Sequence, residues 1–384
     1  MSLLGFGEDG ATTVQIDEGV CSDLDQRAAQ GANVVEVMPY QDDLDLTTAM
    51  RFLEDLHDVE QGGMAGRKNV SDPLTIELVF EDGSLRFRFG PGNRHQNKQV
   101  QMAARTHYGD ADINEAPPSF LNVEPGQHLA GAWLTLRDPD YFLPIKHYQI
   151  TPEQFETDPY DSITSELVGM PTDAKTNAMV QVVLRPAWSN HPRDRKNWYH
   201  GVDKTAKRLK QPSQGFRWGS VAEDVITGMV GGEPVDDDAT KKTPATQEQK
   251  QAAEIVANQR AEKGYHLNVR VFAASEDPDE AIERVEDTAR MYRTFYTSTY
   301  EQGFTPEFPS GGGLQDLVMS AASREWIDRN IVFSTSTLAG VAHLPTDLNT
   351  QQIDYSRTSE SGSTPSAAPE FESFQEQSDT EAGQ

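Results

Sequence analysis

The sequence contains one cysteine, Cys21, and no long apolar run. A single cysteine cannot form an intramolecular disulfide, and it cannot supply a cysteine-based zinc site. No stretch approaches the roughly eighteen consecutive apolar residues that indicate a transmembrane helix. The first residues lack the basic and apolar segments of a secretory signal. We therefore predict a cytoplasmic protein, and we leave open a peripheral location at a membrane face or in a virion.

Motifs for several kinds of catalysis are also missing. The sequence has no G-x-x-x-x-G-K-[ST], so the backbone cradle for nucleotide phosphates is not encoded. It has no G-x-S-x-G elbow to place a serine nucleophile. The nine histidines form neither an i, i+4 pair nor an H-E-x-x-H arrangement. We therefore predict a non-enzymatic protein without a cofactor or a metal site.

Basic residues are scarce relative to acidic ones. The chain has 61 Asp and Glu against 33 Lys and Arg, a formal net charge of −28, while its apolar fraction of 36% remains that of a globular protein. The acidic residues are dispersed, which is typical of proteins of halophilic archaea that stay soluble in high salt. An acidic face for binding a partner is the alternative. Either way, this charge disfavours non-specific binding of nucleic-acid phosphates over most of the surface.

The first third of the chain predicts alternating strands and helices. The apolar run Val34–Tyr40 contains a proline near its end and indicates a strand. Asp45 can cap a helix over residues 46–58, where apolar residues recur at helical spacing. The strand Leu74–Phe80 alternates apolar and polar residues and is followed by an Asp-Gly turn and a second alternating strand, which predicts a hairpin. Asn93–His107 predicts another helix.

The second half predicts a similar succession. Thr151-Pro152 and Asp158-Pro159 each place a capping residue before a proline, as at helix starts. Met179–Trp188 predicts a strand, and a helix followed by a strand is expected over 247–271. The most complete helix start is Asp277-Pro278-Asp279-Glu280, which combines a cap, a proline and a capping-box glutamate. We expect its helix to reach Thr299, with an apolar stripe from Ile282 to Phe295.

These elements predict an α+β fold made of two ferredoxin-like modules packed together. We expect a flexible N-terminus over 1–32, a first module over 33–150 and a second module over 151–355. A loop insertion interrupts the second module at 211–246, where the sequence is rich in Pro, Gly and Asp and has little periodicity. Residues 356–384 are rich in Ser, Glu and Gln and predict a disordered acidic tail.

One stretch, FSTSTLAGVAHLP at 333–345, resembles the short element that closes the accessory region of conjugation and type IV secretion ATPases, just before their nucleotide-binding domain. Further stretches resemble other parts of that region and occur in the same order as in the family. They are LEDLHDV (53–59), THYGDADI (106–113), PIKHYQI (144–150), DPYDSITSEL (158–167), VQVVLRPAW (180–188) and HLNVRVFAAS (266–275). Each is weak alone, and their order carries the resemblance. Tyr108-Gly109 departs from the family's Tyr-Pro, and the 211–244 insert is long.

The resemblance implies an accessory or adaptor subunit of a DNA-translocation or secretion-like machine. The family's P-loop domain is absent from this sequence, so we expect a separately encoded ATPase of the hexameric translocase type as the partner, in a complex that can sit at a membrane. We assign the contact with that partner to Leu338, His343, Leu344 and Pro345, because the family's motor domain would begin there.

The segment Arg185–Arg217 is basic, with nine Lys and Arg against two Asp. Tryptophan, tyrosine and phenylalanine residues are interleaved with these cations, a composition that suits phosphate contact and base stacking. Pairing with the protein's own acidic surface, or with an acidic partner, is the other explanation. The candidate contact residues are Arg193, Arg195, Lys196, Trp198, Lys204, Lys207, Arg208 and Lys210.

Two other functions are compatible with this sequence. The chain can be a nucleic-acid-binding protein that uses this basic segment, or a structural or assembly protein of a haloarchaeal virus.

Overall fold

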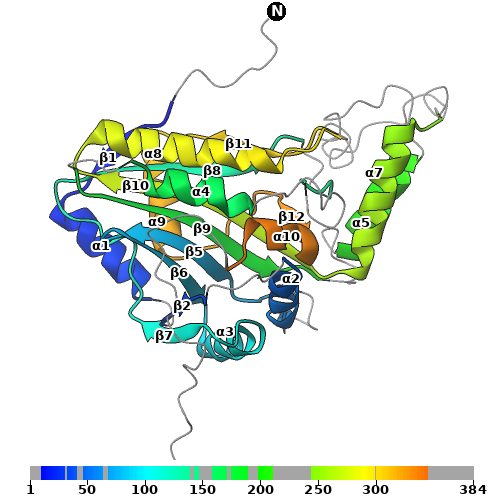
Figure 1. Cartoon of the computed structure of the whole chain (residues 1–384), viewed down its shortest axis with the longest axis horizontal. Helices are drawn as coiled ribbons and strands as arrows, with labels where there is room; N and C mark the ends of the chain where they lie inside the picture. The colour runs from blue at the N-terminus through cyan, green and yellow to red at the C-terminus, as the bar shows by residue number, and fades with distance from the viewer. Residues whose placement is uncertain are drawn as a thin grey trace, which may run out of the picture.

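The structure is a computed structural model that describes residues 10–30, 33–40, 46–63, 68–138, 142–146, 158–170, 174–188, 198–210, 244–298 and 300–344. Ten strands of these ranges form one antiparallel sheet, and helices cover both of its faces (Figure 1). The predicted mixed α+β class is therefore confirmed. None of the described helices is both long enough and apolar enough to cross a lipid bilayer.

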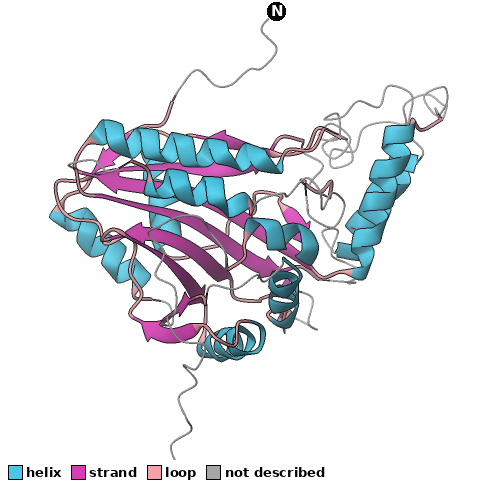
Figure 2. Ribbon diagram, in the orientation of Figure 1, coloured by secondary structure: helices cyan, strands magenta, loops and turns pink. Residues whose placement is uncertain are grey.

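The first part of the chain alternates strands and helices (Figure 2). Its elements are β1 (Thr13–Gln15), α1 (Glu18–Ala28), β2 (Val34–Met38), α2 (Leu46–Asp55), β3 (Gln61–Gly62), β4 (Lys68–Asn69), β5 (Leu74–Glu81), β6 (Ser84–Pro91), α3 (Arg94–His107) and β7 (Asp112–Ala116). The two short strands β3 and β4 pair only with each other, apart from the large sheet.

The second part contains the longest strands of the described chain. Its elements are β8 (His128–Leu136), α4 (Pro159–Val168), β9 (Thr176–Pro186), α5 (Trp198–Lys210), α7 (Gln247–Asn258), a 3₁₀ turn (Gln259–Ala261), β10 (Gly264–Ser275), α8 (Pro278–Met291), a second 3₁₀ turn (Tyr292–Phe295), β11 (Phe304–Glu307), α9 (Gly312–Ala322), β12 (Val332–Ser334) and α10 (Thr335–Val341).

The hairpin of β5 and β6 forms where the sequence predicts it. Asp82 and Gly83 have φ angles of +51° and +76°. Two-residue hairpin turns of this kind need positive φ at both central positions, and Asp-Gly is among the pairs that adopt it most easily. The turn fixes the register so that Glu77 lies opposite Arg88. Leu74 and Ile76 then point to one face of the sheet, and the charged pair lies on the other.

The strand order repeats within the sheet. Residues 34–116 run strand, helix, strand, strand, helix, strand, and their strands lie in the order β7-β2-β6-β5. Residues 128–307 contain β8, α4, β9, β10, α8 and β11, and these strands lie in the order β11-β8-β10-β9, with α5 and α7 between β9 and β10. Both sets therefore have the spatial order fourth, first, third, second. Pairing of β5 with β9, from Leu74↔Leu184 to Phe80↔Ala178, joins them.

Apolar residues on the two faces of the sheet form two separate cores. The larger core holds the apolar residues of α2, α3, α4, α8 and α10, together with every second residue of the strands. The smaller core lies on the opposite face under α1 and α9. A third cluster joins α5 and α7 into a helical hairpin, which Figure 1 shows beyond one end of the sheet. Each helix therefore buries its apolar stripe against one of three cores.

Predicted helix starts agree with the structure where it describes them. The Asp158 and Asp277 side chains accept backbone N–H groups at the starts of α4 and α8. Glu280 does not complete a capping box, because its carboxylate pairs with Arg284 one turn later. Helix α8 ends at Met291 and continues as a 3₁₀ turn to Phe295, short of the predicted end. The predicted caps Asp45 and Thr151 lie outside the described residues.

Several predicted boundaries are wrong. The segment 1–32, predicted to be flexible, contains β1 and α1, which are held because Ile16 and Leu24 are buried in the smaller core. Residues 128–136, which the prediction included in the first module, form β8. This strand lies between β10 and the edge strands of the second set. Strands β7 and β8 were not predicted. Most of the 211–246 insertion and all of the 356–384 tail lie outside the described residues, but α7 begins at Gln247 as predicted.

The packing of α5 generates a first prediction. A Cβ at Gly201 would lie 1.8 Å from Phe142 Cζ, so Gly201→Ala must displace either the ring or the helix. We expect a loss of about 1–3 kcal/mol in the free energy of unfolding, with faster amide exchange in α5 and α7, measured by hydrogen–deuterium exchange and thermal melts. Gly312→Ala is the control, since nothing lies within 4 Å of its Cβ position. Equal behaviour of the two variants would contradict the packing.

Candidate docking junction

The last stretch of the resemblance, at 333–345, contributes most of β12 and all of α10. Strand β12 pairs with the first residues of β10, and α10 packs across α2. The Ser334 hydroxyl caps α10 by accepting the Thr337 N–H. The Ser336 N–H donates to a Glu262 carboxylate oxygen at 2.9 Å. Strand β12 and helix α10, which we call the closing element, therefore contact both repeated halves of the sheet. They join the halves on the face of the larger core.

An aspartate, a histidine and a tyrosine hold the end of this element. His343 Nε2 lies 3.0 Å from Asp158 Oδ2. The His343 ring stacks on Tyr160 with centroids 4.2 Å apart. The Tyr160 hydroxyl donates to the Val341 carbonyl at 2.6 Å. Because Asp158 also caps α4, the start of that helix is fixed to the end of α10.

The electrostatics of this group favour an ionised carboxylate. Burial alone would raise the pKa of Asp158. The positive charge and hydrogen bond of His343, together with the Tyr160 N–H, outweigh burial and hold the pKa of Asp158 below its usual value. Burial also raises the pKa of the Tyr160 phenol, which stays neutral and acts as a hydrogen-bond donor. Asp158 and Tyr160 therefore fix geometry rather than exchange protons near neutral pH.

Other resemblance-bearing stretches reach the same place. The Tyr108 hydroxyl at the end of α3 lies beside the backbone of Leu344, which opposes in part the rise in the pKa of this phenol that burial causes. Phe52 of α2 packs edge-on against Tyr108, with centroids 5.6 Å apart. The Tyr265 hydroxyl, beside β12, donates to the Leu53 carbonyl at 2.7 Å. Stretches that are more than 200 residues apart in sequence therefore meet around α10. We call this place the α10 junction.

His57, in the stretch 53–59, also makes a contact at the α10 junction. Its Nε2 lies 2.9 Å from the Gly264 carbonyl, at the start of β10. Burial lowers the pKa of His57, and the hydrogen bond to Gly264 opposes that effect only in part. The ring is therefore neutral at pH 7 and links the end of α2 to the sheet.

The junction corrects the predicted docking residues. Leu338 is fully buried, and His343 and Leu344 are only 6% and 5% exposed. Their side chains pack inside the chain and cannot touch a partner directly. The apolar LAGVAHL pattern marks a buried helix rather than an exposed contact surface, which is the commoner meaning of such a pattern. Pro345 lies outside the described residues.

The structure divides the predicted basic contact residues into three groups. Trp198 is fully buried and donates its indole N–H to the Gln259 carbonyl at 3.2 Å, so it is a core residue and not a stacking platform. Arg208 is partly buried, whereas Lys204, Lys207 and Lys210 are exposed on one side of α5. Arg193, Arg195 and Lys196 lie outside the described residues.

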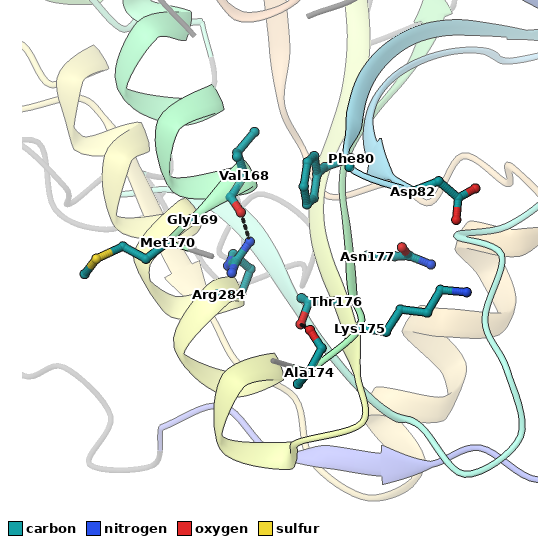
Figure 3. Close-up of a pocket in the computed structure, with 11 residues that line it drawn as sticks. Phe80, Asp82, Val168, Gly169, Met170, Ala174, Lys175, Thr176, Asn177 and Arg284 are labelled. Atoms are coloured by element: carbon teal, nitrogen blue, oxygen red, sulfur yellow. Dashed lines mark hydrogen bonds between the residues drawn. The ribbon is translucent and has the colours of Figure 1, made fainter. Parts of the chain in front are cut away.

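A cavity of about 390 Å³ opens at the far end of β9 from the junction (Figure 3). Phe80, Met170, Lys175 and Arg284 line it. The Arg284 guanidinium is already engaged, since it donates to the carbonyls of Leu167 and Val168 and pairs with Glu280. Its role is to hold the end of α4 against α8, and none of the other described residues that line the cavity is a buried charge.

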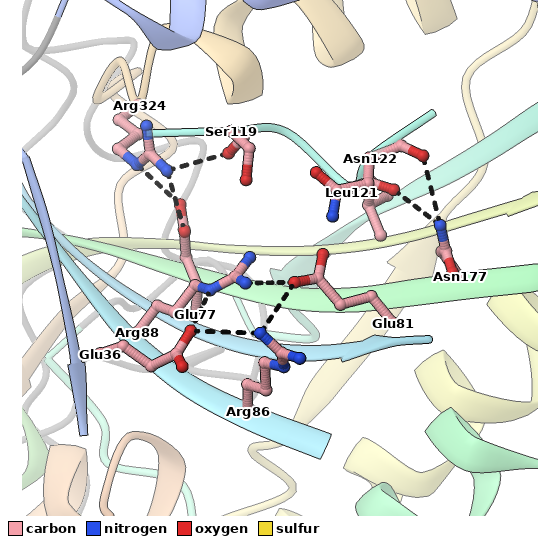
Figure 4. A network of polar contacts seen from close by, with 10 residues as sticks. All are labelled: Glu36, Glu77, Glu81, Arg86, Arg88, Ser119, Leu121, Asn122, Asn177 and Arg324. Atoms are coloured by element: carbon pink, nitrogen blue, oxygen red, sulfur yellow. Dashed lines mark hydrogen bonds and ion pairs between the residues drawn. The ribbon is translucent and has the colours of Figure 1, made fainter. Parts of the chain in front are cut away.

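A buried polar network crosses the face of the sheet that α1 and α9 cover (Figure 4). Arg324, after α9, binds both oxygens of Glu77 at 2.9 and 3.1 Å, and Gln181 donates to the same carboxylate at 3.0 Å. Arg88 joins Glu36 to Glu81. Opposite charges at facing positions of a predicted hairpin were the available signal for this network, which sequence analysis missed.

Arg270 extends the network across β10. Its guanidinium donates to Gln181 at 3.0 Å and lies 4.6 Å from the centre of the Trp133 ring. The pKa of Arg270 is lowered to about 9, mainly by burial; Glu325 opposes the change and Arg329 adds to it. Such fully enclosed charges fix one arrangement of strands and covering loops, because any other arrangement would leave them unpaired.

The His, Cys, Asp and Glu side chains of the described residues do not gather into a metal site. No group of three or more His, Cys, Asp or Glu converges within the described ranges. Cys21 is half-buried with its Sγ 3.7 Å from the Val123 carbonyl, and burial raises the pKa of its thiol. That thiol is therefore a weak nucleophile.

A family model described as a domain of unknown function, DUF8128, matches residues 6–356. The match spans both repeated halves of the sheet and the α10 junction. No curated protein matches the chain.

The Asp158–His343 pair predicts a pH-dependent stability. The pKa of Asp158 is lowered in the folded chain. Its contribution is therefore complete well above its ordinary pKa of about 3.9 and is lost as pH falls through the folded value. Asp158→Asn keeps a helix cap but removes the charge, so we expect about 1–2 kcal/mol less stability at pH 6.

That deficit should shrink below about pH 4, and thermal melts from pH 3 to 7 measure it. Asp203→Asn, in an exposed pair with Arg260, is the control and should change little at any pH. A deficit for Asp158→Asn that is the same at every pH would contradict the assignment.

Proposed function

We propose, for a chain that belongs to the DUF8128 family, a non-enzymatic adaptor function: docking a separately encoded P-loop ATPase in a DNA-translocation or secretion-like machine. One observation carries the proposal. Four of the stretches that resemble the accessory region of conjugation ATPases, at 53–59, 106–113, 158–167 and 333–345, meet around the α10 junction.

The repeated strand order supports a finer description of the fold. Ferredoxin-like units have the succession β-α-β-β-α-β. Residues 34–116 and 128–307 each follow this succession, with the same spatial order of strands. We therefore propose two ferredoxin-like modules whose second strands, β5 and β9, pair edge to edge. In the second module, α5 and α7 occupy the position of the Asp82-Gly83 turn in the first.

The junction provides a rigid point of attachment in this proposal. Strand β12 belongs to the second module by its pairing, and α10 packs on α2 of the first. The position of Leu344, the last described residue, is thus fixed relative to both modules. Because the motor domain follows this point in the resembling family, the partner should dock on the exposed rim around it. The rim includes Asp55, at the end of α2, whose side chain is 58% exposed.

A cytoplasmic location, with the complex placed at a membrane face through the partner, is part of the same proposal.

Site-specific cross-linking tests the docking position. Cys21→Ala removes the only cysteine, and a new cysteine at Asp55 then carries a short cross-linker beside the junction. We expect a cross-linked product with the separately encoded P-loop ATPase. A cysteine at Lys175, at the other end of β9, is the control and should give little product. Equal yields from both positions, or no complex with the unmodified chain, would contradict the proposal.

The basic side of α5 favours a second candidate function, binding of nucleic acid. Its one carboxylate, Asp203, is engaged by Arg260 at 3.0 Å. Lys204, Lys207 and Lys210 are exposed and form no ion pair with a described residue. The pairing with the protein's own surface that the sequence allowed is thus not seen for these three lysines in the described chain. They can instead approach successive phosphates.

A salt titration tests this second function. If the three lysines contact phosphates, log K for a 20-base-pair duplex should fall with log salt at a slope near −2 to −3, by about 0.9 per phosphate. The variant with glutamine at positions 204, 207 and 210 should lose most of that slope. Fluorescence anisotropy with labelled duplex measures both. An unchanged slope in the variant would eliminate α5 as the contact.

A further inference from the structure

Helix α3 carries a cationic stripe that sequence analysis did not single out. Arg94, Lys98 and Arg105 are exposed, and Met102 between them is 68% exposed. The four positions are separated by four, four and three residues, so they fall within one narrow arc of the helix and span about 16 Å along it. The opposite side of α3 is buried through Val100, Ala103 and Ala104.

The charge of this helix departs from the rest of the chain. Helix α3 has no Asp or Glu among its 14 residues, in a protein with 61 of them. Helices α1, α4, α7 and α8 each have an acidic residue in the first turn, where the helix dipole favours negative charge, whereas α2, α3, α5, α9 and α10 have none. Helix α3 places Arg94 there instead. A local preference broken without a compensating contact inside the chain points to a contact outside it.

Neighbouring carboxylates do not neutralise the stripe. Asp55 is bound by His107 at 2.7 Å, and Asp58 lies 3.8 Å from His95. Glu115 accepts a hydrogen bond from Gln101 at 2.7 Å. These three carboxylates thus contact the histidines and a glutamine of α3 rather than the cations of the stripe. Arg94, Lys98 and Arg105 form no ion pair with any residue of the described ranges.

The stripe also adjoins the α10 junction. Tyr108 ends α3, and its hydroxyl lies beside the backbone of Leu344. Asp55, on the proposed docking rim, is bound by His107 in the last turn of α3. The exposed side of α3 therefore continues the rim on which the partner is proposed to dock.

We infer that this side of α3 is the docking surface for an acidic face of the partner ATPase, with Met102 entering an apolar socket. The inference rests on the proposed function. An exposed apolar side chain ringed by charges matches a protein interface, where a buried anchor supplies affinity and rim charges steer and orient. A nucleic-acid backbone would use the cations but would give Met102 no partner. In a chain of net charge −28, this stripe also lets an acidic partner approach in one orientation.

Affinity measurements with the separately encoded P-loop ATPase test the inference. The variant with Arg94, Lys98 and Arg105 changed to glutamine should bind at least about tenfold more weakly at low salt, and the difference should shrink as salt screens the charges. Met102→Glu should weaken binding at least about tenfold at all salt concentrations. Both changes are on the exposed side, and thermal melts check that the fold is kept.

The matched control is the variant with glutamine at positions 204, 207 and 210, which removes the same three charges from α5. It should bind the ATPase like the unmodified chain. Equal loss from the α3 and α5 variants would overturn the inference, since only net charge would then matter. So would unchanged ATPase affinity in the α3 variants, or loss of duplex DNA binding in them instead. If the unmodified chain forms no complex, the proposed function itself fails, which the cross-linking experiment detects separately.

Discussion

The structure depends on the pairing of β5 with β9. This ladder runs over seven residue pairs and turns two sets of four strands into one sheet. Edge strands with unpaired backbone groups are a liability, and each set protects the second strand of the other. Because the joined sheet buries both faces, its central strands are apolar on both sides except for the polar network. The two halves cannot move independently without breaking this ladder.

The two faces of the sheet differ in the contacts that hold their elements together. On one face, Glu77 binds Arg324 of the segment after α9, and Arg88 joins Glu36 and Glu81 of the neighbouring strands. On the other, the closing element fastens α2 to the start of β10 and holds the start of α4. Its motif residues are conspicuous in the sequence because burial restricts them, not because a partner touches them. We therefore place the proposed docking role on the exposed rim around the junction, where α3 carries exposed cations.

Local signals predicted local structure well. The Asp82-Gly83 turn and the Asp277-Pro278 helix start depend on backbone preferences of a few adjacent residues, and both formed as expected. Strand β8 was missed, although GAWLTL is apolar and Pro125-Gly126 precedes the strand, because strict alternation did not mark it. The end of α8 was also misplaced, because a 3₁₀ turn continues its apolar stripe to Phe295.

By itself, the sequence determined the α+β class, most of the described helix starts and the order of the resemblance-bearing stretches, since these follow from periodicity, capping and composition. Only the tertiary structure decided that the two halves share one sheet, that Leu338 and His343 lie inside the core, and that Trp198 is a packing residue. It also decided which cations remain exposed on α3 and α5. The reason is physical: a side chain's environment is set by residues far away along the chain, and no short-range pattern encodes those contacts.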